Sequence, residues 1–172
     1  DFGVNYGPEL TQVAGRMNRD QIAESILYPN QEVAPQWLTT NITTRDGETL
    51  HGWWMSVPNA KGTVLFFHGN AGNISHRINY LAMFKRLGYN TLLFDYRGYG
   101  QSSGVPSESG TYLDAQAAWR YLTETRGIAP VRIAVFGESL GGAVAAWLAA
   151  QEKPGLLALA SSFTSVPDLA AK

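Results

Sequence analysis

Residues 132–150, RIAVFGESLGGAVAAWLAA, decide the fold. The first part is an apolar run typical of a buried strand, and the last part is an alanine-rich run typical of a helix. Between them, Ser139 is flanked by Gly137 and Gly141 in the pattern G-x-S-x-G. A strand that turns sharply into a helix strains its central residue, and the residues two positions away must be small. The stretch therefore predicts a serine hydroxyl that stands clear of a sheet, at the positive end of a helix dipole. A plain turn in which Ser139 only caps the helix is the alternative.

The chain on either side of this stretch alternates short apolar runs with amphipathic ones. Such alternation predicts βαβ units, and hence a parallel sheet with right-handed crossovers. Two β-rich runs that flank Arg45-Asp46-Gly47 come first and predict an antiparallel hairpin, since Asp-Gly is a strong signal for a two-residue turn. The hairpin strands are expected at 37–44 and 48–57, the later strands at 63–69, 90–96, 132–138 and 156–163, and the helices at 75–88, 111–127 and 141–152.

The first of these helices carries clear end signals. Ser75 is expected to cap its start, and Gly88 to end it in a left-handed conformation. Tyr80, Phe84 and Leu87 follow the helical spacing i, i+4, i+7 and should share one face.

Composition bounds the class of protein. With 172 residues, 45% of them hydrophobic and 16% charged, the chain suits one globular domain. A net charge of −1 and the lack of a Lys/Arg cluster give no reason to expect nucleic acid as a partner. Because the sequence has no cysteine, disulfides, thiolate metal sites and thioether-bound haem are excluded. We expect no metal and no cofactor.

The loop after the first parallel strand, FFHGNAGNISHR, is rich in residues that let backbone N–H groups turn inward. In this fold context an oxyanion hole takes one N–H from the residue after the nucleophile and one from this loop. We therefore assign the two donors to Leu140 and Asn70, with Ala71 as the second choice in the loop. A plain turn that caps the following helix is the alternative for the loop.

Four segments, FFHGNAGN, DYRGYGQSSG, GESLGG and SSFTSVPDLA, resemble those of the α/β-hydrolase fold serine hydrolases, most closely the ABHD/BEM-type subgroup. The resemblance covers about residues 37–172 and implies a three-layer α/β-hydrolase fold, with a mostly parallel sheet preceded by an antiparallel hairpin and truncated after the strand at 156–163. It implies an esterase or thioesterase that uses Ser, Asp and His without a cofactor. It places the nucleophile on Ser139 and the oxyanion donors on Asn70 and Leu140.

Residues 1–36 form a separate N-terminal segment with loop-rich sequence and one helix candidate, MNRDQIAESILYP. The segment resembles the end of a bacterial c-type cytochrome module, but it lacks the Cys-x-x-Cys-His haem site. We assign it no electron-transfer function.

The family order of the triad is Ser, Asp, His, yet no histidine follows Ser139. The three histidines, His51, His68 and His76, all precede it. The resemblance gives His68 a loop-bracing role, and His51 and His76 are expected to be solvated polar residues. We therefore expect the general base and its orienting acid to be missing from this chain.

Four further polar residues have lesser expected roles. Asp95 and Arg97 should brace the loop after the second parallel strand. Asp168 matches a position at which the resembled subgroup does not place its triad acid. Glu138 is expected to support the nucleophile or to line the entrance to it.

Three functions remain open. The first is a serine hydrolase that acts on a small-molecule ester or acyl substrate and is nearly inactive as this chain. The second is a non-catalytic α/β-hydrolase-like binding protein, and the third is a half-site completed by a partner chain or a missing C-terminal segment. An uncovered strand edge would make the isolated chain aggregation-prone. The compartment is not fixed, with a cytoplasmic location slightly favoured for the hydrolase portion.

Overall fold

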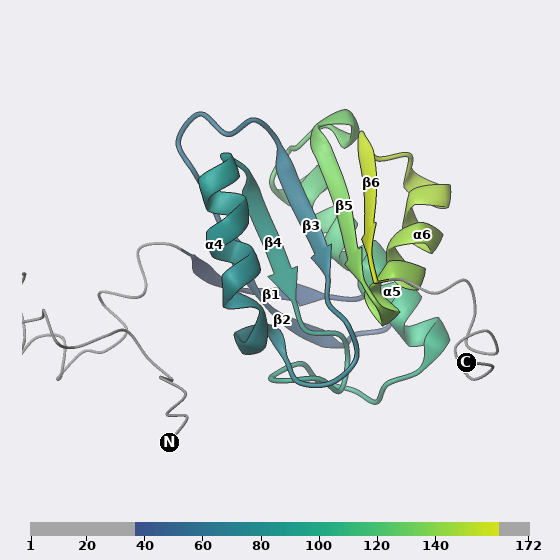
Figure 1. The fold of residues 1–172 in the computed structure, drawn as a ribbon. Coiled ribbons are helices and arrows are strands. Elements are labelled where there is room, and N and C mark those ends of the chain that lie inside the picture. Colours follow the sequence, from purple (N-terminus) through teal and green to yellow (C-terminus); the bar gives the residue numbers. More distant parts are fainter. Residues whose placement is uncertain (1–36, 162–172) are drawn as a thin grey trace, which may run out of the picture. The chain divides into compact units, whose positions relative to one another are not determined.

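A twisted sheet of six strands in the order β1-β2-β4-β3-β5-β6 organises residues 37–161, the part of the chain that the computed structural model describes (Figure 1). The strands β4, β3, β5 and β6 run parallel, whereas β1 pairs with β2 and β2 with β4 in antiparallel fashion. The strands are β1 (Leu38–Thr43), β2 (Thr49–Met55), β3 (Thr63–Phe67), β4 (Asn90–Phe94), β5 (Ile133–Glu138) and β6 (Leu156–Ala160), and the α-helices are α4 (Ile78–Leu87), α5 (Glu108–Arg120) and α6 (Leu140–Glu152).

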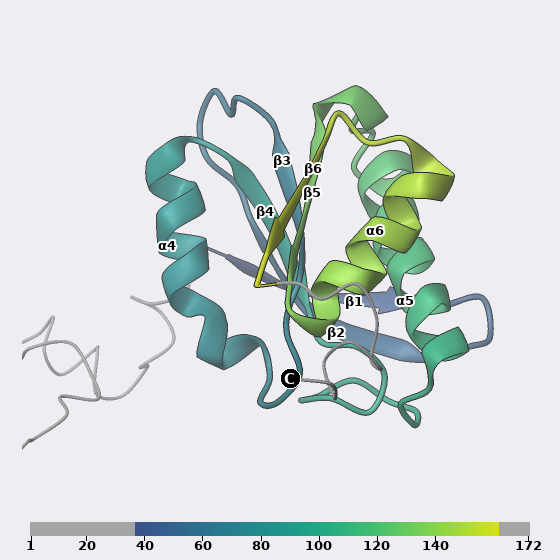
Figure 2. The same ribbon diagram turned by 45° about the vertical axis from the view of Figure 1, so that its right-hand side comes forward.

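Helices cover both faces of the sheet. Helix α4 lies on one face, and helices α5 and α6 lie on the other (Figures 1 and 2). Strand β3 is buried at all five positions because its side chains alternate between the two resulting cores: Phe66 packs with Phe84 of α4, and Phe67 packs with Val144 of α6. The predicted three-layer α/β architecture is confirmed, as are its parallel strands and its leading hairpin.

The hairpin loop spans the three residues left between the predicted strands and is longer than a two-residue Asp-Gly turn. The N–H of Thr44 donates to the carbonyl of Glu48 at 2.9 Å, so three residues rather than two form the loop between them. Gly47 has a φ of 93°, the left-handed conformation that the last residue of such a loop requires. The Asp-Gly signal located the hairpin correctly, but the loop type was wrong.

Helix α4 starts differently from the prediction. A 3-10 turn, Ile74–Arg77, precedes it, and Asn73 rather than Ser75 caps that turn, its side chain accepting a hydrogen bond from the N–H of Ser75. Gly88 ends the helix with a φ of 83°, as predicted. Leu87 lies in the last turn of the helix and is 50% exposed, and the buried side chains of α4 are Leu81 and Phe84.

Helix α5 begins three residues earlier than the sequence indicated. Ser107 is its N-cap, and the Ser107 hydroxyl accepts from the N–H of Gly110 at 3.1 Å. The last part of the predicted helix is a π-helical turn, Tyr121–Thr125. Trp119 and Leu122 are buried against the sheet, so the amphipathic pattern continues across the change of helix type.

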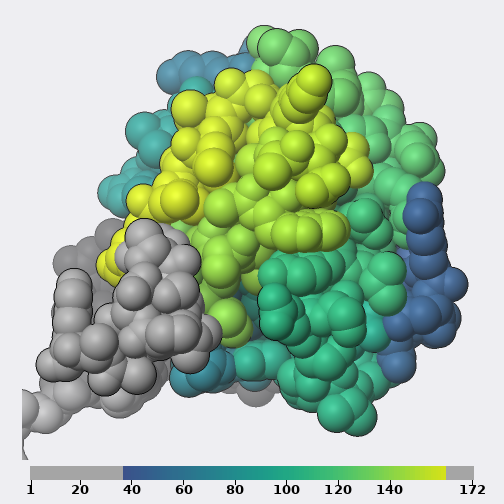
Figure 3. Space-filling view, turned by 90° about the vertical axis from the view of Figure 1, so that its right-hand side faces the viewer, coloured from purple at the N-terminus to yellow at the C-terminus, as the bar shows by residue number. Residues whose placement is uncertain are grey.

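Strand β6 is the outermost strand on its side of the described sheet. It lies at the surface in Figure 3, where it is drawn in yellow beside α6. Leu156 is 59% exposed and Leu159 is 48% exposed. Aggregation of the isolated chain stays a prediction. The helix expected within residues 1–36, the cytochrome resemblance of that segment and the position of Asp168 lie outside the described residues.

The parallel pairing brings three loops to one edge of the sheet. Strand β3 pairs with β4 on one side and with β5 on the other. Because parallel strands end at the same edge, the loops that carry His68, Asp95 and Ser139 follow neighbouring strands. This edge is where α/β sheets hold their ligands.

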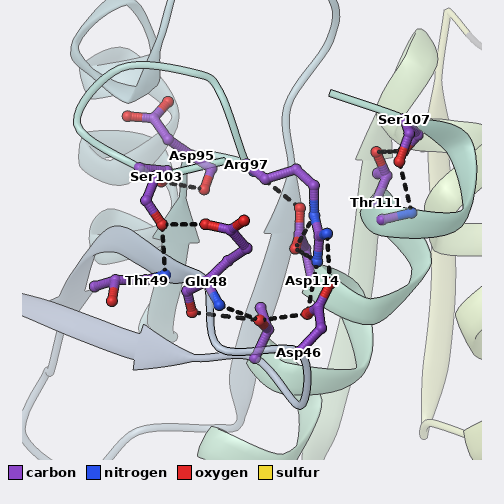
Figure 4. Close-up of polar contacts among 12 residues, drawn as sticks. Asp46, Glu48, Thr49, Asp95, Arg97, Ser103, Ser107, Thr111 and Asp114 are labelled. Atoms are coloured by element: carbon purple, nitrogen blue, oxygen red, sulfur yellow. Dashed lines mark hydrogen bonds and ion pairs between the residues drawn. The ribbon is translucent and has the colours of Figure 1, made fainter. Parts of the chain in front are cut away.

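Arg97 joins three separate parts of the chain below this edge (Figure 4). Its Nε donates to Asp114 of α5 at 2.9 Å, and its terminal nitrogens donate to Asp46 of the hairpin turn at 2.7 and 3.1 Å. The Asp114 carboxylate is fully buried and also accepts from the Arg97 backbone N–H at 2.9 Å. Hydrogen bonds from Arg97, and then from Thr44, hold the pKa of Asp46 far below its usual range. These contacts agree with the bracing role predicted for Arg97.

Asp95 holds the loop after β3. It is 1% exposed, and its Oδ1 accepts from the N–H of Ile74 at 2.9 Å and lies 3.5 Å from Nε2 of His68. The backbone carbonyl of Asp95 accepts from the hydroxyl of Ser102 at 2.7 Å. Burial raises the pKa of the Asp95 carboxyl to about 6, against the hydrogen bond from Ile74. These contacts agree with the predicted bracing role.

Removal of Arg97 should destabilise the fold strongly. Arg97→Met leaves the buried Asp114 carboxylate without its cation, which typically costs about 3–5 kcal/mol. Urea-induced unfolding measures the loss. Arg45→Met, which alters an exposed arginine of the hairpin turn that contains Asp46, should change the free energy of unfolding by less than about 0.5 kcal/mol. Equal effects of the two substitutions would contradict the bracing role.

Asp95 should make folding stability depend on pH. Its folded pKa of about 6 lies above its ordinary value of 3.8, so the folded state keeps a proton that the unfolded state has released. The resulting stabilisation is fully present below pH 3.8 and is lost as the pH rises through about 6. Relative to Asp95→Asn, the wild type should therefore lose up to about 3 kcal/mol of unfolding free energy between pH 4 and 7.

The histidines next to Asp95 have the opposite effect on the pH dependence of folding stability. Burial lowers the pKa of His68 and that of His51, so their protonation at low pH opposes folding. Both are present in the wild type and in the variant, so the difference between the two proteins reports Asp95 together with its interaction with His68. Urea titrations of both proteins across the range measure it, and a difference that does not change with pH would contradict the prediction.

Candidate active site

Ser139 occupies a strained turn between β5 and α6. Its φ of 52° and ψ of −117° lie where non-glycine residues are seldom found. Although Ser139 is in the N-cap position of α6, its side chain makes no capping hydrogen bond. Its hydroxyl has no hydrogen-bond partner within residues 37–161, and the residue is only partly buried. The structure therefore does not agree with the alternative, in which the side chain of Ser139 only caps the helix.

The two glycines of the motif allow the helix to sit on the sheet. A Cβ on Gly141 would lie 2.1 Å from the carbonyl oxygen of Phe67 in β3. A Cβ on Gly137 would lie 2.4 Å from the Gly141 carbonyl oxygen and 2.7 Å from Cβ of Ala145. Both distances are too short for any side chain, so the steric reason inferred from the sequence holds at both positions.

The loop after β3 lies directly against the turn at Ser139. The point at which Gly69 would carry a Cβ is 3.3 Å from Cβ of Ser139. Ala71 and Gly72 follow with φ angles of 70° and 73°, so the backbone turns tightly. A loop this close to the serine can present N–H groups to an atom bonded to its hydroxyl oxygen.

Of the two predicted oxyanion donors, Leu140 follows Ser139 directly, and Asn70 follows Gly69 in the loop that lies against Ser139. Leu140 is the first residue of α6, where backbone N–H groups have no partner within the helix. Asn70 is exposed and follows Gly69, and its Oδ1 accepts from the hydroxyl of Tyr99 at 2.8 Å. The side chain of Asn70 is thus held by the loop after β4, which fixes the residue whose N–H we assign to the hole.

His68 is buried between the loop after β3 and the loop after β4. Its side chain is inaccessible, and Nδ1 lies 2.8 Å from the carbonyl oxygen of Gly69, to which it can donate. The ring packs 4.6 Å from that of Tyr96 and 5.7 Å from that of Tyr99. Burial lowers the pKa of His68, which keeps the ring neutral at pH 7. Its contacts are those of a residue that braces the loops, as predicted.

The other two histidines differ from each other. His51 of β2 is only 8% exposed because β2 lies inside the sheet, so the prediction that it is solvated was wrong. His76 is exposed as predicted, but its ring also accepts from the N–H of Asn73 at 3.2 Å and completes the cap of the 3-10 turn. Gly72 leaves room for this ring, since a Cβ there would lie 2.7 Å from Nδ1.

Glu138 makes contacts that the sequence did not reveal. Its Oε2 accepts from Nε of Arg77 at 2.9 Å, and its Oε1 accepts from the hydroxyl of Tyr80 at 3.3 Å. Burial, and then the Glu138 charge, raise the pKa of Tyr80. Arg77 stands within the quoted loop segment, but its partner is 61 residues away, and no local pattern links the two.

Metal ligands do not gather anywhere in the described part of the chain. Residues 37–161 contain no group of three or more His, Cys, Asp or Glu side chains placed to hold a metal ion. Of the helices that the structure describes, none has the length and apolar character needed to cross a membrane.

Comparison with known proteins gives the chain its relatives. A family model described as "Serine aminopeptidase, S33" matches residues 58–170. The α/β-hydrolase domain-containing protein WAV2 of Arabidopsis thaliana is 44% identical over 78% of this chain and 44% of its own length. Protein bem46 of Schizosaccharomyces pombe is 41% identical over 74% of this chain and 45% of its own length. The chain thus spans about half the length of these curated relatives.

A solved structure agrees with this assignment. The esterase Pf2001 of Pyrococcus furiosus superposes with a TM-score of 0.65 at 28% identity, over 78% of this chain and 52% of that protein. The predicted resemblance to α/β hydrolases of the ABHD/BEM type is confirmed. Since the family model covers more than half of its residues, the chain belongs to the S33-type family of α/β-hydrolase fold proteins.

Proposed function

We propose that this chain carries the nucleophile half of a serine hydrolase site that cleaves esters or thioesters by acyl transfer. The observation that supports this most directly is the backbone of Ser139, which is strained at a φ of 52° and lies against the loop that contains Asn70. A residue that only bound a ligand would not need such strain. The structural similarity to an esterase favours an ester substrate.

The reaction proceeds in two stages. Oγ of Ser139 attacks the carbonyl carbon of the substrate, and its proton passes to a general base. The carbonyl oxygen becomes an oxyanion that accepts hydrogen bonds from the N–H groups of Leu140 and Asn70. The tetrahedral intermediate then breaks its C–O or C–S bond, and the leaving group takes up the proton. A water molecule attacks the acyl-enzyme and releases the acid and free Ser139.

The general base and its acid lie outside these 172 residues in this proposal. No histidine follows Ser139, and the contacts of His68 are with Gly69, Asp95 and two tyrosine rings. The missing groups come from a further part of the same protein or from a partner chain. Loss of triad members costs about 10⁶ in turnover elsewhere and leaves about 10³–10⁴ over water, so the chain alone should be nearly inactive.

Covalent labelling tests the nucleophile. A fluorophosphonate should react with the native protein, as purified from its own cells, by forming an Oγ–P bond and releasing fluoride. Peptide mass mapping should place the adduct on Ser139, and Ser139→Ala should abolish it. Ser109→Ala, which alters an exposed serine of α5, should leave labelling unchanged. An adduct that survives Ser139→Ala, or no adduct at all, would overturn the proposal.

Chemical rescue tests the absence of a base from the chain. Residues 1–172 alone should label slowly, because nothing takes the proton from Ser139. Free imidazole should then raise the labelling rate in proportion to its concentration, with only its unprotonated form active. Mass spectrometry measures the fraction of protein that carries the adduct at each time. Fast labelling without imidazole would show that a base within this chain serves the site.

A further inference from the structure

A polar cluster beside the nucleophile has no part in the mechanism derived so far. It consists of Arg77, Tyr80 and Glu138, and the Arg77–Glu138 ion pair measures 2.9 Å. The Arg77 side chain is 18% exposed and that of Glu138 is 24% exposed, so water screens the pair only partly. Arg77 ends the 3-10 turn that follows the Asn70 loop, and Glu138 directly precedes the nucleophile. The pair therefore connects the two halves of the proposed oxyanion hole.

Glu138 is also close to the reacting centre. The point at which Gly69 would carry a Cβ is 3.7 Å from Oε2 of Glu138 and 3.3 Å from Cβ of Ser139. The carboxylate and the nucleophile thus lie against the same point of the loop. Both charges of the pair act on the neighbouring His68. Burial has the dominant effect on the pKa of His68 and lowers it; the charge of Arg77 also lowers this pKa, and the charge of Glu138 raises it.

A carboxylate at this place would hinder acyl transfer if it stood alone. The reaction develops a negative charge on the oxygen atom held by Leu140 and Asn70. Two negative charges a few ångströms apart in a partly buried site repel each other, and this repulsion slows formation of the oxyanion by roughly 10- to 100-fold. A cation bound to the carboxylate removes most of that repulsion.

We propose that Arg77 is a positioning residue for acyl transfer at Ser139, and that its guanidinium holds and neutralises Glu138 so that an oxyanion can form beside it. The proposal rests on the proposed function. In this proposal, Glu138 holds Arg77 next to the turn that contains Ser139. The rate of acyl transfer then depends on the charge of Arg77 rather than on its size.

Comparison of a single variant with a double variant separates charge neutralisation from simple bracing. The measured quantity is the second-order rate constant for fluorophosphonate labelling of Ser139 in the native protein. Arg77→Met, which leaves Glu138 unpaired, should slow labelling by about 10- to 100-fold. Arg77→Met combined with Glu138→Gln should recover most of that loss, because the unpaired charge is gone. A residue that only braces the loop predicts no recovery in the double variant.

Further variants control for charge and folding. Arg77→Lys keeps the charge and should label within a few-fold of the wild type. Arg77→Gln keeps a hydrogen-bond donor for Glu138 without the charge, and it serves if Arg77→Met does not fold. Arg86→Met removes an exposed arginine of α4 and should have no effect. Thermal melts of every variant show whether a lower rate reflects lost structure.

The outcomes distinguish the two proposals. A wild-type protein that does not label overturns the proposed function and, with it, this inference. If the wild-type protein labels, and Arg77→Met and Arg77→Gln both label as fast as the wild type, the inference alone is overturned. A slow Arg77→Met variant with an equally slow double variant also overturns it, in favour of bracing. Slow single variants with recovery in the double variant support it.

Discussion

The close approach of helix α6 to the ends of β3 and β5 is the constraint on which the site depends. It is possible only because Gly141 presents no side chain to the carbonyl of Phe67. The helix then starts immediately after the strand, and the residue between them must adopt a φ of 52°. Backbone strain at Ser139 is thus the consequence of packing a helix on a sheet at the shortest separation. The packing of α6, with Val144, Ala145 and Leu148 fully or almost fully buried, maintains that strain.

Around this turn, polar contacts connect the loops to one another. Asp95 fixes the loop after β3 through the N–H of Ile74, and Tyr99 holds the exposed side chain of Asn70. Arg97 connects the loop after β4 to the hairpin and to α5. A buried polar group left without its partner is costly, so the buried contacts of Asp95 and of Arg97 with Asp114 hold their loops in one arrangement. The loops that would bind an oxyanion are therefore ordered before any substrate arrives.

Sequence reasoning located the strands, the class of fold and the strained turn at Ser139, because each of these has a local signal. A continuous apolar run marks β3, and two glycines at fixed spacing mark the turn at Ser139. The same reasoning failed where several structures suit one local sequence. Ser75 and Asn73 are both good caps, and the structure uses Asn73. His51 is polar and stands in a hairpin, but its burial depends on β4, which comes much later in the chain.

The contacts beside Ser139 could not be predicted for a related reason. Arg77 and Glu138 are ordinary charged residues in the sequence, and only the parallel pairing of β3 with β5 brings their segments together. Likewise, the hydroxyl of Tyr99 reaches Asn70 because β3 and β4 are neighbours. Patterns of spacing find residues that act within one segment, whereas residues that act across strands become visible only in the fold.

The central pairing of β3 with β5 has a consequence for how the chain reaches its folded state. Thr63 pairs with Ile133, so all of β4, α4 and α5 lie in the intervening loop. Closing so long a loop has a large entropic cost before any contact repays it, and high contact order slows folding. During synthesis β3 can pair with β4, but its other edge must wait until β5 leaves the ribosome. In that interval this edge is unpaired, and Phe67 lacks the core that it shares with α6, so molecular chaperones would have their best chance to bind.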